Sequence, residues 1–331
     1  MEIIFPKKFN EGDVVRVITP ATSAKCFDDE LIRLATKNIE GLGLTVSFSE
    51  HLYEVDMFNS STAKSRVSDL HEAFLDKRVK GILTFIGGFN SNQMLRLIDW
   101  NIIKNNPKIF CGYSDITVLA NAIYSKTGLV TYSGLHFSSF GQKKLQEYNV
   151  DYFKKCLFSD ESFNVGASQQ WSDDRPQKWQ SEDRALENND GWWVINEGYA
   201  KGKSIGGNIA SLRLLYGTEY MPSLKDSILF VEDDHYTTND IAEFDRNLQS
   251  LIHQQDFSAA RALIIGRFQI GSKMTQKILT EIIKSKRELD DIPVVANVDF
   301  GHTDPLITFP IGGGVEIMLE GDNKKLEIIN H

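Results

Sequence analysis

A serine stands at the sharpest turn signal in the chain, between a buried strand pattern and a helix pattern. The segment is Phe110-Cys111-Gly112-Tyr113-Ser114-Asp115, and helical periodicity begins at Ile116. A serine at a strand-to-helix turn presents its hydroxyl above the sheet edge, and the Asp115 amide at the helix N-terminus could bind an oxyanion. Taken alone, a Ser-Asp pair before a helix more often serves as a cap.

Two later strand patterns end in an acid and in a histidine. The run 226–231 leads into Glu232-Asp233-Asp234, and the run 293–298 leads into Gly301-His302. Sites in parallel α/β sheets form at the carboxyl ends of strands. A serine nucleophile needs a base, and the base needs an acid that orients it. The joint placement therefore favours a triad of Ser114, Glu232 and His302, with Asp234 as the nearest rival acid because it shares the face of Glu232.

Paired glycines follow a third buried strand pattern. Gly87-Gly88 comes directly after the run 81–86. Glycines let backbone amides approach a ligand closely, although a plain turn has the same signature. We predict that the amides of Gly88 and Asp115 form an oxyanion hole, and that Gly87 contacts the substrate.

The elements that must position these residues alternate between strand and helix. In the first half, strands are expected at 14–19, 44–48, 81–86 and 108–111, and helices at 28–40, 65–74, 91–100 and 116–126. This order predicts an α/β fold with a mostly parallel N-terminal sheet flanked by helices. In the second half, a helix near 208–216, strands at 227–231, 262–265 and 293–298, and a hairpin over 315–329 predict a second, β-rich α/β domain.

The segment between these halves is polar and carries most of the tryptophans. Four of the five lie within residues 160–198. We predict an N-terminal domain over 1–160 with the nucleophile, a linker or substrate loop over 161–198, and a C-terminal domain over 199–331 with the acid and the base. Trp171 and Trp179 sit among charges, which suits an aromatic wall for a ligand, whereas packing against the core is the alternative. Trp192 and Trp193 precede Val194-Ile195, as in a strand.

Composition narrows the class of protein. The chain has 331 residues, 41% hydrophobic, and a net charge of −9 with both signs scattered, which argues against a nucleic-acid polymer as partner. Its three cysteines have no metal or disulfide spacing, so no metal site and no cofactor are predicted. No signal-like or membrane-spanning run is present, so a cytoplasmic location is expected. The run 198–204 resembles a phosphate-binding loop but has three residues between its glycines instead of four.

Several of these segments, taken together and in order, resemble the LD-carboxypeptidase family, and within it the microcin C self-immunity peptidases. The matching segments are 112–117, 126–134, 206–208, 229–233 and 301–305. The resemblance implies a Ser-Glu-His triad, two α/β-type domains with the site between them, no metal and a homodimer. By this match Ser114 is the nucleophile, Glu232 the orienting acid and His302 the base, and Asn208 belongs to a motif near the site.

Two departures bear on the substrate. The LD-carboxypeptidases usually have Arg-Gly-Gly where this chain has Ile86-Gly87-Gly88, and their middle segment is shorter and lacks the tryptophans. Both departures favour the immunity-like branch, whose loop tryptophans contact a nucleobase. We therefore predict a serine peptidase that cleaves a C-terminal amide-like bond in a peptidyl-nucleotide or aminoacyl-adenylate analogue. The alternatives are a muropeptide LD-carboxypeptidase of cell-wall recycling and a non-catalytic module that binds a small ligand.

Overall fold

The first half of the chain builds a six-stranded sheet with one antiparallel edge. The computed structural model describes residues 2–174, 184–235 and 240–331. The strand order is β14-β5-β4-β3-β1-β2, and every pair is parallel except β14 with β5. The bounds are β1 Val14–Ile18, β2 Thr45–Phe48, β3 Val79–Thr84, β4 Ile109–Cys111, β5 Thr131–Ser133 and β14 Phe309–Ile311. The apolar runs of β3 and β4 are almost wholly buried, as expected of strands covered on both faces.

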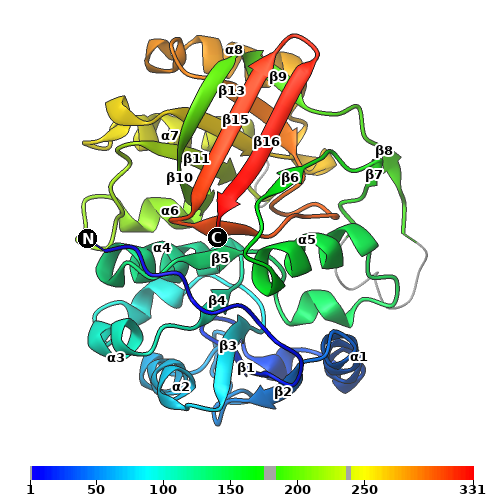
Figure 1. Ribbon diagram of the computed structural model, residues 1–331, viewed down its shortest axis with the longest axis vertical. Coiled ribbons are helices and arrows are strands. Elements are labelled where there is room, and N and C mark those ends of the chain that lie inside the picture. The colour runs from blue at the N-terminus through cyan, green and yellow to red at the C-terminus, as the bar shows by residue number, and fades with distance from the viewer. Residues whose placement is uncertain (1, 175–183, 236–239) are drawn as a thin grey trace.

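Helices flank this sheet in the lower half of Figure 1. They are α1 Asp29–Glu40, α2 Ala63–Leu75, α3 Trp100–Asn105, α4 Thr117–Thr127 and α5 Glu147–Phe158. In α1 the buried side chains are Leu31, Ile32, Ala35 and Ile39, which is the spacing of one helical face. Helix α4 is different, because most of its residues are buried. It is therefore an interior helix, and it begins directly after the turn that carries Ser114.

The second half builds an eight-stranded mixed sheet in the order β6-β16-β15-β10-β11-β12-β13-β9. The bounds are β6 Phe163–Val165, β9 Trp193–Asn196, β10 Gly198–Asn208, β11 Ser227–Glu232, β12 Ala262–Gly266, β13 Val294–Val298, β15 Gly314–Glu320 and β16 Asn323–Asn330. Strands β10 to β13 are parallel, and the hairpin β15–β16 crosses the front of the upper half in Figure 1. Its helices are α6 Ile209–Leu212, α7 Asp240–Ile252 and α8 Gln276–Lys284.

Side chains from both sheets interlock where the two halves meet. The ring of Phe230 on β11 stacks on Phe309 of β14, with the ring centroids 4.4 Å apart. Thr117 of α4 accepts a hydrogen bond from the amide of Asn208 at 3.0 Å, and Asn121 donates to the Gly206 carbonyl at 2.8 Å. Helix α4 is thereby fixed against the carboxyl end of β10, so the strand ends of both sheets face one region.

The predicted fold class is confirmed, while some predicted elements are wrong. The helix expected over 91–100 is a 3₁₀ turn over Ser91–Met94, and α3 begins only at Trp100, where Asp99 caps the Asn101 amide. The described part of residues 161–198, predicted as a linker or a substrate loop, contributes β6 and β9 to the second sheet and forms the small pair β7 Gln170–Trp171 and β8 Glu187–Asn188. The run 198–204 opens strand β10, which the loop-like sequence did not reveal. The domain bounds at 160 and 198 stay a prediction.

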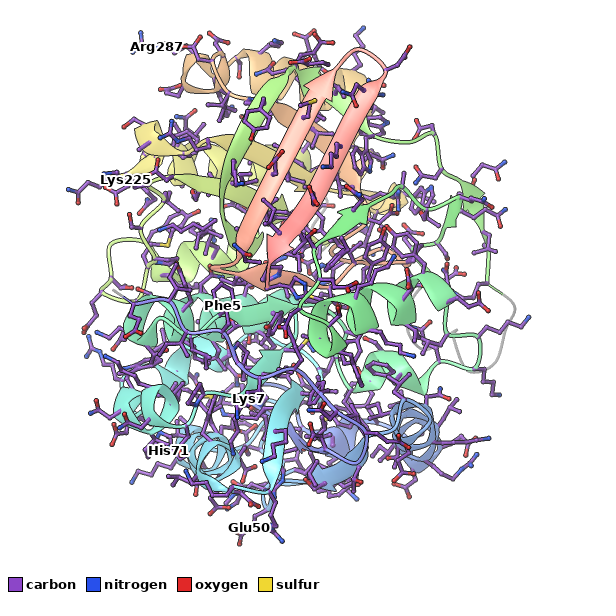
Figure 2. The ribbon with its side chains drawn as sticks, in the orientation of Figure 1. Phe5, Lys7, Glu50, His71, Lys225 and Arg287 are labelled. Atoms are coloured by element: carbon purple, nitrogen blue, oxygen red, sulfur yellow. The ribbon has the colours of Figure 1, made fainter. Side chains whose placement is uncertain are left out.

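Charged side chains project outward around the periphery of the molecule. Glu50, Lys225 and Arg287 are exposed and labelled at the rim of the ribbon in Figure 2. Within the described residues, none of the helices combines the length and the apolar character that crossing a bilayer requires.

Candidate active site

The backbone at Ser114 is held in an unusual conformation. Strand β4 ends at Cys111, a 3₁₀ turn begins at Ser114, and Ser114 has a φ of 61°. Few residues other than glycine adopt this left-handed region, and such strain concentrates at functional sites. Gly112 makes the turn possible, since a Cβ there would lie 2.1 Å from the Thr84 hydroxyl. The turn therefore has the geometry of a nucleophile elbow.

Three side chains from three strand ends meet in a continuous hydrogen-bonded chain. Nε2 of His302 lies 3.0 Å from Oγ of Ser114, and Nδ1 of His302 lies 2.8 Å from Oε2 of Glu232. Glu232 is the last residue of β11 and is only 2% exposed. Residues 299–304, which we call the histidine loop, carry His302. Gly301 lets this loop approach Glu232 closely, because a Cβ at Gly301 would lie 2.6 Å from Oε2 of Glu232. The predicted contact between Glu232 and His302 is present, whereas Asp234 bonds to Asn208 instead.

The charge around His302 is dominated by carboxylates. Burial lowers the pKa of the imidazole, but the charge and hydrogen bond of Glu232, with the charges of Asp234 and Asp233, outweigh it and raise the pKa to about 9. Burial and the same neighbouring carboxylates raise the pKa of Asp233 to about 8. The site thus stabilises a positive charge on His302, which is the charge that a general base acquires when it accepts a proton.

The predicted oxyanion donors lie beside the serine. A Cβ at Gly87 would lie 3.1 Å from Oγ of Ser114 and 3.4 Å from the Asp115 nitrogen. The Asp115 side chain is turned away and accepts the Ser91 amide at 2.9 Å, which holds the start of the helix in place. Gly88 and Asp115 both line the pocket that contains Ser114. The structure therefore places Gly87 next to the hydroxyl and Gly88 and Asp115 in the same pocket, and their role as oxyanion donors stays a prediction.

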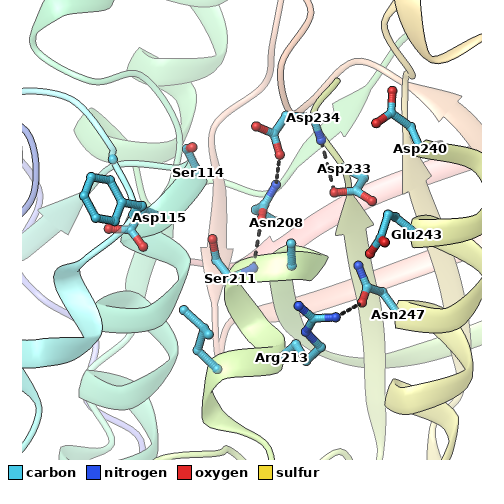
Figure 3. A pocket seen from close by; sticks show the side chains of 14 residues that line it. Ser114, Asp115, Asn208, Ser211, Arg213, Asp233, Asp234, Asp240, Glu243 and Asn247 are labelled. Carbon is cyan, nitrogen blue, oxygen red and sulfur yellow. Dashed lines mark hydrogen bonds between the residues drawn. The ribbon is translucent and has the colours of Figure 1, made fainter. Parts of the chain in front are cut away.

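A pocket of about 440 Å³ opens from Ser114 toward helix α7. Figure 3 shows acidic side chains along one side of it and Arg213 below. The acids on that side are Asp233, Asp234, Asp240 and Glu243, and Asp115 is a fifth acidic residue of the lining, next to Ser114. Arg213 donates a hydrogen bond to Asn247 at 2.6 Å. Among the described residues that line the pocket, no other is a lysine or an arginine. The pocket can thus hold a small ligand next to the serine, and its field favours positive charge.

Asn208 joins this pocket to the local fold. Its Oδ1 accepts the Ser211 amide at 2.9 Å and so caps α6, and its Nδ2 donates to Oδ1 of Asp234 at 3.2 Å. The side chain lines the pocket together with Ser114, as predicted for a residue that contacts substrate. Its role in binding stays a prediction.

The two loop tryptophans have different outcomes. Trp171 is partly buried, and the guanidinium carbon of Arg267 lies 5.1 Å from the centre of its ring. Trp171 is absent from the described lining of the Ser114 pocket. Trp179 lies outside the described residues. A role for either ring in stacking on a base therefore stays a prediction.

Sequence reasoning missed the polar residues that support the histidine loop. Asp299 is fully buried, and its Oδ1 lies 2.6 Å from Nη1 of Arg267, which is 2% exposed. Asp304, two residues after His302, is 5% exposed and pairs with Arg184. Two aspartates that flank a candidate histidine within six residues were the available signal. In the part of the chain that the structure describes, no group of three or more His, Cys, Asp or Glu side chains could hold a metal ion.

Comparison with known proteins places this arrangement in a family. Residues 15–134 match the LD-carboxypeptidase N-terminal domain, and residues 201–317 match the LD-carboxypeptidase C-terminal domain. YocD of Bacillus subtilis strain 168, provisionally named a carboxypeptidase, is 48% identical over 330 residues, which cover 99% of this chain and 100% of that protein. The crystal structure of an MccF-like protein from Bacillus anthracis is 49% identical, covers 99% of this chain and 100% of that chain, and superposes with a TM-score of 0.97.

A third relative has been solved with ligands. The microcin C7 self-immunity protein MccF of Escherichia coli is 33% identical over 295 residues, which cover 83% of this chain and 81% of that protein. A structure of MccF in complex with glutamyl sulfamoyl guanosine is 28% identical, with a TM-score of 0.88 and 98% of each chain covered. Matches of this extent on both halves of the sequence leave one conclusion: the chain belongs to the LD-carboxypeptidase family.

Proposed function

We propose that this protein is a serine peptidase that hydrolyses a C-terminal amide-like bond. The observation that carries the proposal is the hydrogen-bonded chain from Ser114 through His302 to Glu232. With its Nδ1 hydrogen donated to Glu232, neutral His302 can accept the Ser114 proton at Nε2 while Oγ attacks the carbonyl carbon. His302 then returns the proton to the leaving nitrogen, and water releases the acyl group from Ser114 by the reverse sequence.

The oxyanion that forms on the attacked carbonyl needs donors on the other side of the serine. We assign this role to the amides of Gly88 and Asp115, the second of which belongs to the first turn of a helix. Gly87 leaves room for the substrate backbone beside Oγ, and Asn208 presents its amide group in the pocket. The acyl part of the substrate would occupy the 440 Å³ pocket.

As substrate we propose a microcin C-like peptidyl-nucleotide or a related aminoacyl-adenylate analogue, which the enzyme would detoxify in the cytoplasm as a homodimer. Structures of the relative MccF hold glutamyl sulfamoyl guanosine and aspartyl sulfamoyl adenosine, which are ligands of this class. The tryptophans in the sequence of residues 161–198 support this proposal, because aromatic rings bind nucleobases by stacking.

One observation favours a muropeptide as the alternative substrate. Five acidic side chains and one arginine line the pocket, so an acyl group with an amine would be attracted and an acidic one repelled. A diamino acid of a cell-wall peptide carries such an amine. A module that binds a ligand without turning it over is the remaining alternative.

Mass spectrometry of the products separates these functions. The protein is incubated with a microcin C-like conjugate and, in parallel, with a tetrapeptide muropeptide, and the Ser114→Ala variant serves as the matched control. Cleavage of the conjugate at its amide-like bond supports detoxification, and release of the terminal D-amino acid supports the cell-wall alternative. Tight binding of either compound without any product would contradict the peptidase proposal.

A further inference from the structure

A single buried carboxylate next to the histidine loop gathers hydrogen bonds from two other segments. Asp304 is 5% exposed and lies two residues after His302. Its Oδ1 accepts from Asn149 of helix α5 at 2.5 Å. Its Oδ2 accepts from Gln146, which precedes α5, at 2.7 Å and also pairs with Arg184. The two side chains of the ion pair are 7% and 6% exposed, so the carboxylate is held from several directions in a dry environment.

The backbone of the same residue is tied to the tryptophan-bearing segment. The Ser172 amide donates to the Asp304 carbonyl at 2.7 Å, and the Asp304 amide donates to the Ser172 carbonyl at 2.8 Å. Ser172 directly follows Trp171. This pair of hydrogen bonds is an antiparallel β-bridge that joins the histidine loop to the segment around Trp171.

The other end of the histidine loop is attached to that segment as well. Asp299 accepts the Ser168 amide at 2.8 Å and the Ser168 hydroxyl at 2.6 Å. It also pairs with Arg267, whose guanidinium packs against the ring of Trp171. The loop from 299 to 304 is thus anchored at both ends to residues 168–172, and His302 lies between the anchors.

We propose that Asp304 is a positioning residue, which holds the His302 ring in line between Ser114 and Glu232 by locking the histidine loop to helix α5 and to the segment around Trp171. This inference rests on the proposed function. It assigns to the loop segment a part in the chemistry, beyond the choice of substrate.

The role predicts a specific signature in the pH dependence. The titratable and charged groups that face His302 are Glu232, Asp233 and Asp234 from the end of β11, Tyr113 from the serine turn, and His136 behind Tyr113. If the loop shifts, His302 moves away from the carboxylates, and burial then dominates its environment. The acid limb of the pH profile is the rise of kcat/KM with pH as His302 loses its proton. This limb should therefore move to lower pH, which a loss of stability alone would not cause.

The test is Asp304→Asn, which preserves size but replaces Oδ2 by a donor that cannot accept from Arg184 or Gln146. We expect kcat to fall at least about tenfold with little change in KM, and the acid limb to move down by about half a pH unit or more. The matched control is Asp69→Asn. Asp69 is a buried carboxylate, 2% exposed, that accepts from His51 in the N-terminal half. This control should keep the wild-type kcat and acid limb.

Each outcome decides the inference. If Asp304→Asn folds and its acid limb is unchanged, or if only its KM rises, the positioning role is overturned. The proposed function then still stands, provided that the wild type turns over substrate. Absence of wild-type turnover overturns both. An equal loss in the Asp69→Asn control shows a general stability effect and also overturns the positioning role. If circular dichroism shows that Asp304→Asn does not fold, Arg184→Met removes the ion pair together with the hydrogen bond from Arg184 to Gln142, leaves Asp304 in place, and is judged by the same shift of the acid limb.

Discussion

Replacement of the orienting acid by its amide should produce a defect that grows with pH. In the wild type the pKa of His302 is about 9, because the carboxylates around it outweigh its burial. Only about 1% of the imidazole is then neutral at pH 7, so kcat/KM should rise about tenfold per pH unit and level off near pH 9. In Glu232→Gln the carboxylate that contributes most to the raised pKa of His302 is gone, while the burial that lowers this pKa remains. The acid limb of kcat/KM should therefore move well below pH 7.

The size of the defect follows from these two effects. A glutamine cannot stabilise the imidazolium, and its amide group favours the wrong tautomer, a change that costs about 10⁴-fold in comparable triads. At pH 10 we therefore expect a loss of about 10⁴ in kcat/KM. At pH 7 His302 is neutral in the variant but only about 1% neutral in the wild type, which favours the variant by about 10². The loss of kcat/KM at pH 7 should therefore be only about 10².

The assay is kcat/KM for both proteins from pH 6 to 10 on one substrate. Melting temperatures at each pH are the control. The raised pKa of His302 contributes stability that is full below pH 6.5 and is lost as the pH rises through about 9. A wild-type limb near the ordinary histidine pKa of 6.5, or a ratio of wild type to variant that stays constant with pH, would refute the reasoning.

Three further changes test neighbouring parts of the account. Gly87→Ala places a Cβ 3.0 Å from that of Ser114, so kcat should fall about 10²-fold while the melting temperature changes little. Asp233→Asn should flatten the pH dependence of the unfolding free energy, because the raised pKa of Asp233 gives stability that is full below about pH 4 and lost as the pH rises through about 8. Trp171→Ala discriminates two roles: stacking raises KM about 5- to 150-fold only for a substrate with a base, whereas packing on Arg267 lowers the melting temperature and affects both substrates equally.

The parts that could be predicted from sequence are those with local signals. The runs 81–86 and 293–298 are apolar and closed by turn residues, and they overlap β3 Val79–Thr84 and β13 Val294–Val298 in the structure. The meeting of Glu232 and His302 was predictable because both stand at the carboxyl ends of such strands, and parallel strands of one sheet bring these ends to one edge. Ser114 follows β4 in the other sheet, so its approach to His302 also depends on how the two sheets pack against each other.

The parts that escaped prediction depend on contacts distant in sequence. Strand β10 contains glycines and lysines and no apolar run at its start, and it is stabilised by pairing with β11 and β15. The segment 161–198 is polar, yet β6 joins the second sheet through β16, more than 150 residues further along the chain. Likewise, the position of Asp304 near His302 is a local signal, but its contacts are not, because its partners Asn149 and Arg184 lie 155 and 120 residues away.

The identity of the nucleophile is the central claim, and labelling by a fluorophosphonate probe tests it most directly. The probe should add its mass to the intact protein, and peptide mapping should locate it on Ser114. Cys111 should stay unmodified, because its side chain is fully buried and burial raises the pKa of its thiol. Ser114→Ala should keep the circular dichroism of the wild type, lose about 10⁶-fold in turnover and take up no label. Label on Ser114→Ala, or turnover within tenfold of the wild type, would contradict the account.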